Sequence, residues 1–380
     1  MIKGSCNVVR TIKESVCLYL GMSFKEQFPI LAKCTYLNTA SSGILSCSLH
    51  DWRRNHDLDF FNHGSGFRIK QAEFLQQVKE RVAGFFQAKV VNTFLVPNFS
   101  YGFNIFLEGL PVTHRFLLLQ DDYPSVNYAV ECRGFSCDYI QPNAMLEEMI
   151  FEKLTSCKPT VFAFSMVQYT NGFKMDLGFI KRVKANFPEL LIVADGTQYC
   201  GTELFNFEES GLDFLAASGY KWMLAGYGNG FVLLKDELAL QLYTAPNKLN
   251  PPIEPFLQSR TRLSFYFEPG HQDTLCFGSL HQSILFMEKM GVDVLAEKIR
   301  SLSRQALTAF AERGLIDQAI IQYGKQSSIF NLNISDPVYQ KLLESEIICL
   351  SRGNGTRVAF HFYNTEDDLL HLLAVLDQYI

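Results

Sequence analysis

The sequence predicts an α/β protein whose mainly parallel sheet is sandwiched by helices, followed by a smaller α+β C-terminal domain. Between about residues 70 and 235, short apolar runs alternate with amphipathic stretches such as MDLGFIKRVKANFP. The apolar runs are continuous, as is typical of parallel strands that helices bury on both faces. Apolar residues at helical spacing between these runs supply the covering helices.

Six apolar runs are predicted to be the strands of this sheet. In chain order they are NTFLVPN, RFLLLQDD, TVFAFSMVQ, LLIVADGTQ, LDFLAASG and GFVLLKD. Most of them end in polar residues. Ligands bind beyond the carboxyl ends of strands in such sheets, so these polar residues are the first candidates for a functional site.

A chain of 380 residues is longer than one core usually spans, which favours two domains. The stretch TAPNKLNPPIEPF, residues 244–256, contains four prolines and interrupts the pattern. We therefore expect a large domain over 36–250 and a small domain over 251–380, the latter with a long helix at about 278–312, short strands and a last helix from about 365. Residues 1–35 are expected to form a segment that packs on the small domain. Within it, residues 1–21 are either an ordered extension or a loose or misassigned leader.

Composition excludes several classes of function. The net charge is −5 and no basic block stands out, so nucleic-acid binding has no electrostatic support. No apolar run approaches the ~18 residues of a membrane span. None of the ten cysteines forms a C-x-x-C pair, which indicates reduced core residues in a cytoplasmic protein and no metal site.

Lys221 and Asp195 are the first two candidate site residues. Lys221 follows the run LDFLAAS, where burial disfavours the ammonium form and favours a nucleophilic amine. Asp195 ends the run LLIVAD, and Gln198 follows three residues later. Taken singly, the lysine is also compatible with a solvated surface charge and the aspartate with a helix cap. If the two strands are neighbours, however, both side chains reach one crevice. A lysine that forms an imine and a carboxylate that protonates a ring nitrogen are what pyridoxal phosphate (PLP) requires.

The motifs around these residues resemble a known family. ADGTQYCG, followed by DFLAASGYKW and GYGNGFVLL, is similar to the cofactor signature of class V, fold type I, PLP-dependent enzymes. The resemblance extends from YLNTASSG, near residue 36, to HFYNTEDDLLHLLAVL at the end of the chain. It implies the PLP-dependent transferase fold type I. Isopenicillin N epimerase-like class V aminotransferases look most similar.

The resemblance implies specific roles in holding the cofactor. Lys221 forms the Schiff base with PLP and shuttles a proton at Cα. Asp195 pairs with the pyridine nitrogen, and Gln198 donates a hydrogen bond to the phenolic oxygen. Ser218 and Tyr220 reach the phosphate. The family usually has histidine at the place of Tyr220, whose hydroxyl group is also a donor.

Three other segments match the family's cofactor-binding positions. The turn Asn98-Phe99-Ser100 opens a helix under the phosphate, although the family usually has Gly-Thr-Thr there; an ordinary strand-to-helix turn is the alternative. Tyr123 matches the ring that stacks on the cofactor, or else it belongs to a turn before a proline. Tyr169 lies where relatives reach the cofactor oxygen or the substrate.

The remaining matches concern the substrate and a second subunit. Gln168 is a candidate substrate contact, and Arg357 matches the arginine that binds the substrate carboxylate. Arg352 is a weaker candidate for that role, and a solvated strand arginine is the alternative for Arg357. Gly270 and His271 resemble the segment that contacts the partner's phosphate, which implies a homodimer with a shared active site.

The glycines of GYGNG do not form a dinucleotide fingerprint. That motif follows a strand and opens a helix, whereas these glycines precede the apolar run FVLL. We expect a tight turn behind the lysine.

The resemblance leaves the reaction open. An aminotransferase acting on a small amino-acid or keto-acid substrate is expected first. Cysteine desulfurase- or selenocysteine lyase-like, epimerase and lyase activities are alternatives. Cys349 lies in an apolar run that reads as a strand, which disfavours a persulfide mechanism. A non-catalytic PLP-fold binding protein is the alternative of a different class.

Overall fold

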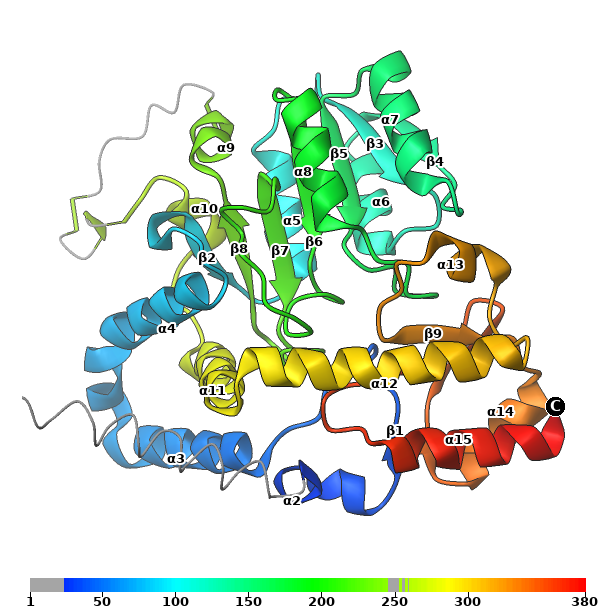
Figure 1. The fold of residues 1–380 in the computed structure, drawn as a ribbon. Coiled ribbons are helices and arrows are strands. Elements are labelled where there is room, and N and C mark those ends of the chain that lie inside the picture. Colours follow the sequence, from blue (N-terminus) through cyan, green and yellow to red (C-terminus); the bar gives the residue numbers. More distant parts are fainter. Residues whose placement is uncertain (1–23, 245–252, 255–256, 259) are drawn as a thin grey trace, which may run out of the picture.

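The computed structural model describes residues 24–244, 253–254, 257–258 and 260–380. It contains a seven-stranded sheet between helices, a three-stranded sheet near the C-terminus and a two-stranded one (Figure 1). The predicted α/β class with a mainly parallel sheet is therefore confirmed. Residues 1–21, for which an ordered extension and a loose or misassigned leader were the two expectations, lie outside the described residues. So does most of the proline-rich stretch 244–256.

The central sheet contains all six predicted strands and one more. Its order is β2-β8-β7-β6-β5-β3-β4, with β4, β3, β5, β6 and β7 parallel and β8 antiparallel to both β7 and β2. The strands are β2 (Thr93–Val96), β3 (Arg115–Leu119), β4 (Ser136–Ile140), β5 (Val161–Ser165), β6 (Leu191–Asp195), β7 (Phe214–Ser218) and β8 (Gly230–Leu234). The unpredicted strand, β4, lies at the edge and is mostly half-buried, so its sequence lacks a continuous apolar run.

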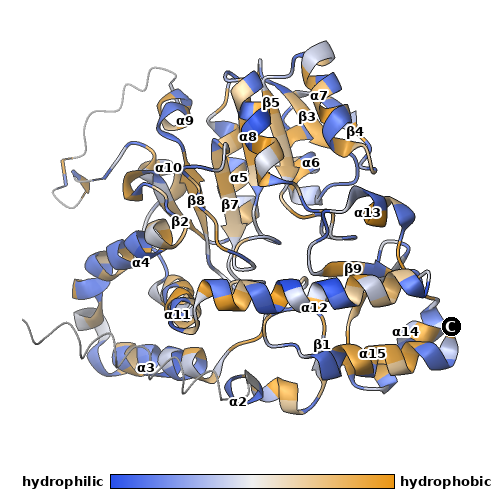
Figure 2. Cartoon of the chain, in the orientation of Figure 1, coloured by the Kyte–Doolittle hydropathy of each residue, from blue (hydrophilic) through white to orange (hydrophobic). Residues whose placement is uncertain are grey.

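Helices cover both faces of the sheet because its strands are apolar on both. Phe162 and Phe164 belong to the core on one face, whereas Val161 and Ala163 belong to the core on the other. In Figure 1, α8 lies in front of the sheet and α5 and α6 lie behind it; Figure 2 shows apolar strands between helices with polar outer surfaces. The helices of this part are α3 (Cys47–His63), α4 (Gln71–Phe85), α5 (Phe99–Glu108), α6 (Pro124–Glu131), α7 (Leu146–Cys157), α8 (Leu177–Asn186) and α9 (Asp236–Gln241). The 3-10 helices η2 (Gly64–Lys70) and η3 (Val90–Asn92) flank α4.

The long helix predicted at about 278–312 is two helices. They are α11 (Thr274–Met290) and α12 (Val292–Glu312), separated by Gly291 at a φ of 84°. This left-handed backbone conformation ends a helix and is one that glycine adopts without strain. In Figure 1, α12 crosses below the central sheet toward the C-terminal part.

The rest of the C-terminal part surrounds a separate apolar core. The three-stranded sheet has the order β11-β12-β9 and packs with α12, α14 and α15. The elements of this C-terminal part are α13 (Gln318–Tyr323), β9 (Ile329–Leu332), α14 (Asp336–Glu344), β10 (Ile347–Ile348), β11 (Leu350–Arg352), β12 (Gly355–Ala359) and α15 (Glu366–Tyr379). The last helix agrees with the prediction from about residue 365. A short helix, α10 (Ser264–Phe267), precedes α11.

The N-terminal segment joins this C-terminal part. After α2 (Phe24–Gln27) and η1 (Pro29–Ala32), β1 (Thr35–Tyr36) pairs in parallel with β10. The following loop, residues 37–46, crosses back toward the ends of the central strands. In the described part of the chain, no helix has both the length and the apolar character to cross a membrane.

Candidate active site

Lys221 and Asp195 lie at the carboxyl ends of two neighbouring strands. Strand β6 ends at Asp195, whose backbone pairs in parallel with Ala216 of β7. Strand β7 ends at Ser218, and the turn that follows contains Lys221. Both charged side chains are about 6% exposed. The expected convergence of the two residues therefore follows from strand order.

Burial and nearby charges favour the neutral amine of Lys221. Burial is the largest effect and lowers the pKa of Lys221. The carboxylate of Asp195 acts in the opposite direction, whereas the guanidinium groups of Arg357 and Arg352 lower the pKa further. A neutral amine is the nucleophilic form of lysine, so this position suits imine chemistry.

Asp195 is a buried carboxyl whose charge depends on partners. Burial raises its pKa, hydrogen bonds from Thr197 and the charge of Lys221 lower it, and Asp122 raises it. The backbone N–H of Thr197 donates to Asp195 Oδ1 at 2.8 Å. A cationic group placed against the other oxygen would hold this carboxyl ionised.

Two tyrosine rings lie beside the lysine amine, and each contacts a further tyrosine. Lys221 Nζ lies 5.5 Å from the ring centroids of both Tyr123 and Tyr220. Tyr169 contacts Tyr123 edge to face at 5.3 Å, and Tyr227 stacks on Tyr220 at 4.7 Å. Tyr123 and Tyr220 therefore both lie beside the amine of Lys221.

Gln198 is held by two hydrogen bonds that fix its amide orientation. The indole N–H of Trp222 donates to Gln198 Oε1 at 2.7 Å, and Gln198 Nε2 donates to the carbonyl of Ala40 at 2.9 Å. An indole can only donate, so Oε1 must be the acceptor. The second N–H of Gln198 is then available for a ligand oxygen.

His361 supports Trp222 from the C-terminal part of the chain. Its Nε2 donates to the carbonyl of Trp222 at 3.0 Å, and its Nδ1 accepts from the N–H of Phe362 at 2.8 Å. This pattern requires the neutral ring protonated at Nε2. Burial lowers the pKa of His361 to about 3. His361 therefore positions the residue that follows Lys221.

The His361→Gln variant is expected to change the pH dependence of stability. The folded protein keeps His361 neutral, whereas an unfolded histidine binds a proton below about pH 6.5. Between these pKa values the unfolded state holds more protons, so stability falls as the pH falls. The loss is up to about 1.4 kcal/mol per pH unit, and the variant lacks it because glutamine does not titrate.

The measurement is the difference in free energy of unfolding between wild type and variant in urea at pH 7 and pH 5. Asp195 has the opposite effect on the slope, since its pKa is raised, but it is present in both proteins and cancels in the difference. A gap between the two proteins that is the same at both pH values would contradict a buried neutral His361.

The N-terminus of α5 faces the end of β7. Asn98 caps the helix by accepting from the N–H of Tyr101 at 2.9 Å, and the N–H of Phe99 donates to Ser218 Oγ at 2.9 Å. Ser100 Oγ donates to Ser125 Oγ at the start of α6. Backbone donors and the positive end of the helix dipole at this place favour an anion.

Arg357 presents a buried guanidinium to the same region. Strand β12 carries it, and its side chain is 2% exposed. Its two terminal nitrogens donate to the carbonyl of Tyr169 and to Ser41 Oγ, each at 2.5 Å, while its Nε is buried without a hydrogen-bond partner. Burial and nearby Arg352 lower the pKa of Arg357 to about 10. A ligand carboxylate would supply the missing acceptor and charge.

The structure brings together most of the predicted site residues, with one exception. Gln168 is buried on the loop after β5, beside Asp122. Arg352 is exposed and lies 5.6 Å from the Tyr169 ring. Gly270 and His271 instead lie near α4, where His271 Nε2 is 2.7 Å from a guanidinium nitrogen of Arg68. No hydrogen bond or ring contact given for the described residues joins this pair to Lys221.

Several supporting residues were not predicted from the sequence. Asp122 is buried and accepts from the N–H groups of Ser165 and Tyr123, so it connects the end of β5 to the residue that precedes α6. In the sequence, the only indication of a role for Asp122 was its position in QDDYP, just before Tyr123. Trp222 and His361 stand inside motifs that resemble the family, but their pairing links positions 139 residues apart.

The glycines after Lys221 form a tight turn, as predicted. Gly226 and Gly228 have φ values of 70° and 86°, and Asn229 Nδ2 donates to the carbonyls of Ala225 and Gly226. The segment leads into strand β8 and opens no helix. In the described ranges, no group of three or more histidine, cysteine or acidic side chains could hold a metal ion.

The chain is similar to known proteins in sequence and in fold. The family described as Aminotransferase class-V matches residues 62–372. The "Uncharacterized aminotransferase YcbU" of Bacillus subtilis is 22% identical over 369 residues, covering 93% of this chain and 97% of that protein.

Two solved proteins share the fold. The apo cysteine desulfurase of Thermococcus onnurineus has a TM-score of 0.79 at 15% identity, covering 93% of this chain and 96% of that one. A C-DES variant with glycine covalently linked to its PLP cofactor has a TM-score of 0.79 at 19% identity, covering 93% and 98%. At these identities the likeness establishes the fold.

Proposed function

Because the chain belongs to the class V aminotransferase family, we propose that it is a PLP-dependent enzyme that acts at Cα of an amino-acid substrate, with transamination as its reaction. The observation that carries this proposal is the buried amine of Lys221 beside the buried carboxyl of Asp195. Burial alone disfavours the charged form of both side chains. Each side chain suits a different part of PLP, the amine its aldehyde and the carboxylate its ring nitrogen.

The residues around Lys221 fit PLP. Lys221 would hold it covalently, and Asp195 would keep the ring nitrogen protonated. Gln198 has an N–H available for the phenolic oxygen, and the Tyr123 ring would cover the pyridine. When bound, PLP supplies an electron sink for the bond broken at Cα.

The phosphate of PLP would bind at the N-terminus of α5. The Asn98-Phe99-Ser100 turn offers backbone donors, and Ser218 already accepts from Phe99 there. Tyr220 stands beside Lys221 as a further hydroxyl donor. Because backbone N–H groups bind an anion whatever the side chain, the departures from the usual family sequence leave this function intact.

Arg357 would orient the substrate through its carboxylate. Its guanidinium donates to a backbone carbonyl and a hydroxyl group, and within the described residues its Nε is a buried donor without an acceptor. Leaving such a donor unpaired costs about 1–3 kcal/mol, which a bound carboxylate would recover. Gln168 and Tyr169, on the loop after β5, would border the same ligand. This chemistry selects a small amino acid or keto acid and leaves the side chain open.

The alternative of a persulfide-forming desulfurase finds little support at Cys349. This residue lies between β10 and β11, is 4% exposed, and burial raises the pKa of its thiol to about 12. A persulfide mechanism needs a reactive thiolate that can reach the substrate. Epimerisation and elimination would use the same Lys221, Asp195 and Arg357.

The proposed function can be tested with purified protein and PLP. The PLP-loaded protein is mixed with a panel of amino acids in deuterium oxide, and deuterium at Cα, keto acid, sulfide and racemisation are measured. We expect Cα exchange and keto-acid formation with the same amino acids. If Cα exchange is accompanied only by sulfide or only by racemised amino acid, the reaction is not transamination. A protein that takes up PLP but exchanges no amino acid would be a binding protein.

We further propose that two copies of the chain share their active sites through Gly270 and His271. Large apolar side chains are exposed on the adjoining α3 and η2: Phe60 at 57%, Phe61 at 85% and Ile69 at 84%. Exposed apolar side chains of this size, gathered on neighbouring elements, mark protein interfaces.

Mixing variants tests the shared site. Lys221→Ala and His271→Ala proteins, each nearly inactive, are expected to regain activity when unfolded and refolded together, since one site of each mixed dimer is intact. An unshared site would give no recovery. Sedimentation velocity of the wild type should show a dimer.

A further inference from the structure

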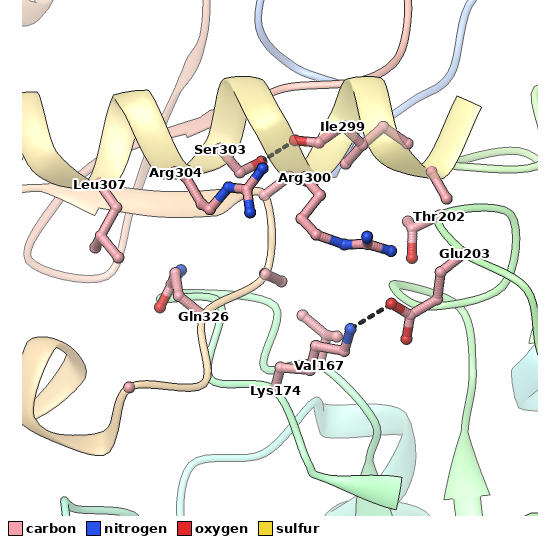
Figure 3. Close-up of a pocket in the computed structure, with 14 residues that line it drawn as sticks. Val167, Lys174, Thr202, Glu203, Ile299, Arg300, Ser303, Arg304, Leu307 and Gln326 are labelled. Atoms are coloured by element: carbon pink, nitrogen blue, oxygen red, sulfur yellow. Dashed lines mark hydrogen bonds and ion pairs between the residues drawn. The ribbon is translucent and has the colours of Figure 1, made fainter. Parts of the chain in front are cut away.

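A cavity lies beside the loops after β5 and β6, which also carry residues of the candidate active site. It has a volume of about 180 Å³, opens to solvent on one side, and is bordered by α12, the loops after β5 and β6, and the segment before β9 (Figure 3). We propose that it binds a small aliphatic carboxylate, an anion with a short apolar chain.

One face of α12 forms the wall of this cavity. The lining residues of the helix are Ala296, Ile299, Arg300, Ser303, Arg304 and Leu307. They recur at intervals of three and four residues, so they share one side of the helix. Lys298, two residues from Arg300, points about 200° away around the helix and is not part of the lining.

The charges around the cavity favour an anion. Lys174, Arg300 and Arg304 line it as cations. Lys174 is paired with Glu203 at 2.7 Å, but the two arginines share the single carboxylate of Glu297, at 2.7 and 3.1 Å. Three cations thus face two carboxylates, which leaves one positive charge for a monoanion to neutralise. Figure 3 shows Arg300 extending toward Thr202 and Glu203.

The apolar lining and the size define the rest of the ligand. Val167, Ile299 and Leu307 present hydrocarbon to the cavity, which a short alkyl chain would cover and which inorganic phosphate would leave unused. A cavity of about 150 Å³ accommodates benzene, so this one holds a ligand of about seven heavy atoms. PLP and nucleotides are larger than that.

The cavity borders two segments that contact Arg357 or its strand. Lys174 lies on the same loop as Tyr169, whose carbonyl accepts from Arg357. Ser328, which lines the cavity, directly precedes β9, and Asn331 of β9 pairs with Arg357 of β12. A ligand in the cavity would therefore bind elements on both sides of Arg357 without occupying its carboxylate-binding place.

Isothermal titration of the PLP-loaded protein with isovalerate tests the proposal. We expect saturable binding to wild type, and roughly tenfold weaker binding to Arg300→Gln and to Arg304→Gln, because each loses a charge-assisted hydrogen bond. Lys298→Gln, with the same loss of charge on the same helix, should bind as wild type does.

Further measurements distinguish binding in the cavity from binding in the active site and define the chemistry of the ligand. Arg357→Gln should keep the isovalerate binding; if binding is lost there and kept in Arg304→Gln, the probe occupies the active site and the proposal is overturned. The neutral isostere isovaleramide should not bind measurably. The proposal would also be overturned if phosphate or isovaleramide bound as tightly as isovalerate. It would equally be overturned if isovalerate did not bind to the wild type at all. None of these outcomes depends on turnover, so the proposed function is tested separately.

Discussion

Replacing Lys221 with alanine is expected to abolish covalent attachment of PLP and to lower kcat by about 10⁴-fold or more. The variant loses both the amine that binds the cofactor and the group that moves a proton at Cα, and a positioned acid–base group alone contributes up to about 10⁴-fold. The fold should persist, because the side chain of Lys221 takes no part in the hydrogen bonds that hold Gln198.

Mass spectrometry after borohydride reduction measures the attachment directly. The wild-type peptide that contains Lys221 should gain the mass of reduced PLP, and the variant should gain none. Lys341→Ala is the matched control, since this exposed lysine pairs only with Glu344 in the ion pairs given for the described chain. Stable attachment of PLP to another lysine in the variant would contradict the role assigned to Lys221.

The Asp195→Asn variant is expected to retain covalent PLP and to lose about 100- to 1,000-fold in kcat. Asparagine keeps an oxygen for the N–H of Thr197 but carries no charge to hold the ring nitrogen protonated. The size follows from the loss of one preorganised electrostatic partner in a buried site. KM should change much less than kcat.

The same variant should shift the titration of Lys221. The carboxylate of Asp195 raises the pKa of Lys221, so its removal lowers that pKa further, and the amine stays neutral to lower pH. Asp213→Asn is the control, because Asp213 is also buried and lies near the amino end of β6, paired with Lys184 at 2.8 Å. We expect it to lose stability without changing kcat. Equal loss of kcat in both variants would indicate a structural effect of the substitution.

The sequence was sufficient to place the central part of the site. Lys221, Asp195 and Gln198 follow apolar runs that could only be buried strands, and neighbouring parallel strands end at one edge. The nearness of Lys221 and Asp195 is therefore a consequence of strand order, and motif resemblance pointed to Arg357.

Other features depend on contacts that no local pattern reveals. The edge strand β4 is half-polar because one side has no neighbour, so its residues do not form an apolar run. The break between α11 and α12 rests on one backbone conformation at Gly291, within an otherwise helical pattern. His361 and Ser41 act through hydrogen bonds to residues 139 and 316 positions away, Trp222 and Arg357.

The loop of residues 37–46, which crosses to the central strands, also determines when the site can form during synthesis. Its Ala40 carbonyl binds Gln198, 158 residues later, and its Ser41 binds Arg357, 316 residues later. The N–H of Gly43 meets the carbonyl of Tyr220 at 2.8 Å. Closing loops of this length costs entropy before any contact is gained, so these contacts are among the slowest to form. On the ribosome, the contacts to Gln198 and Tyr220 can form once the central sheet has emerged, whereas the contact to Arg357 must wait until nearly the whole chain has emerged.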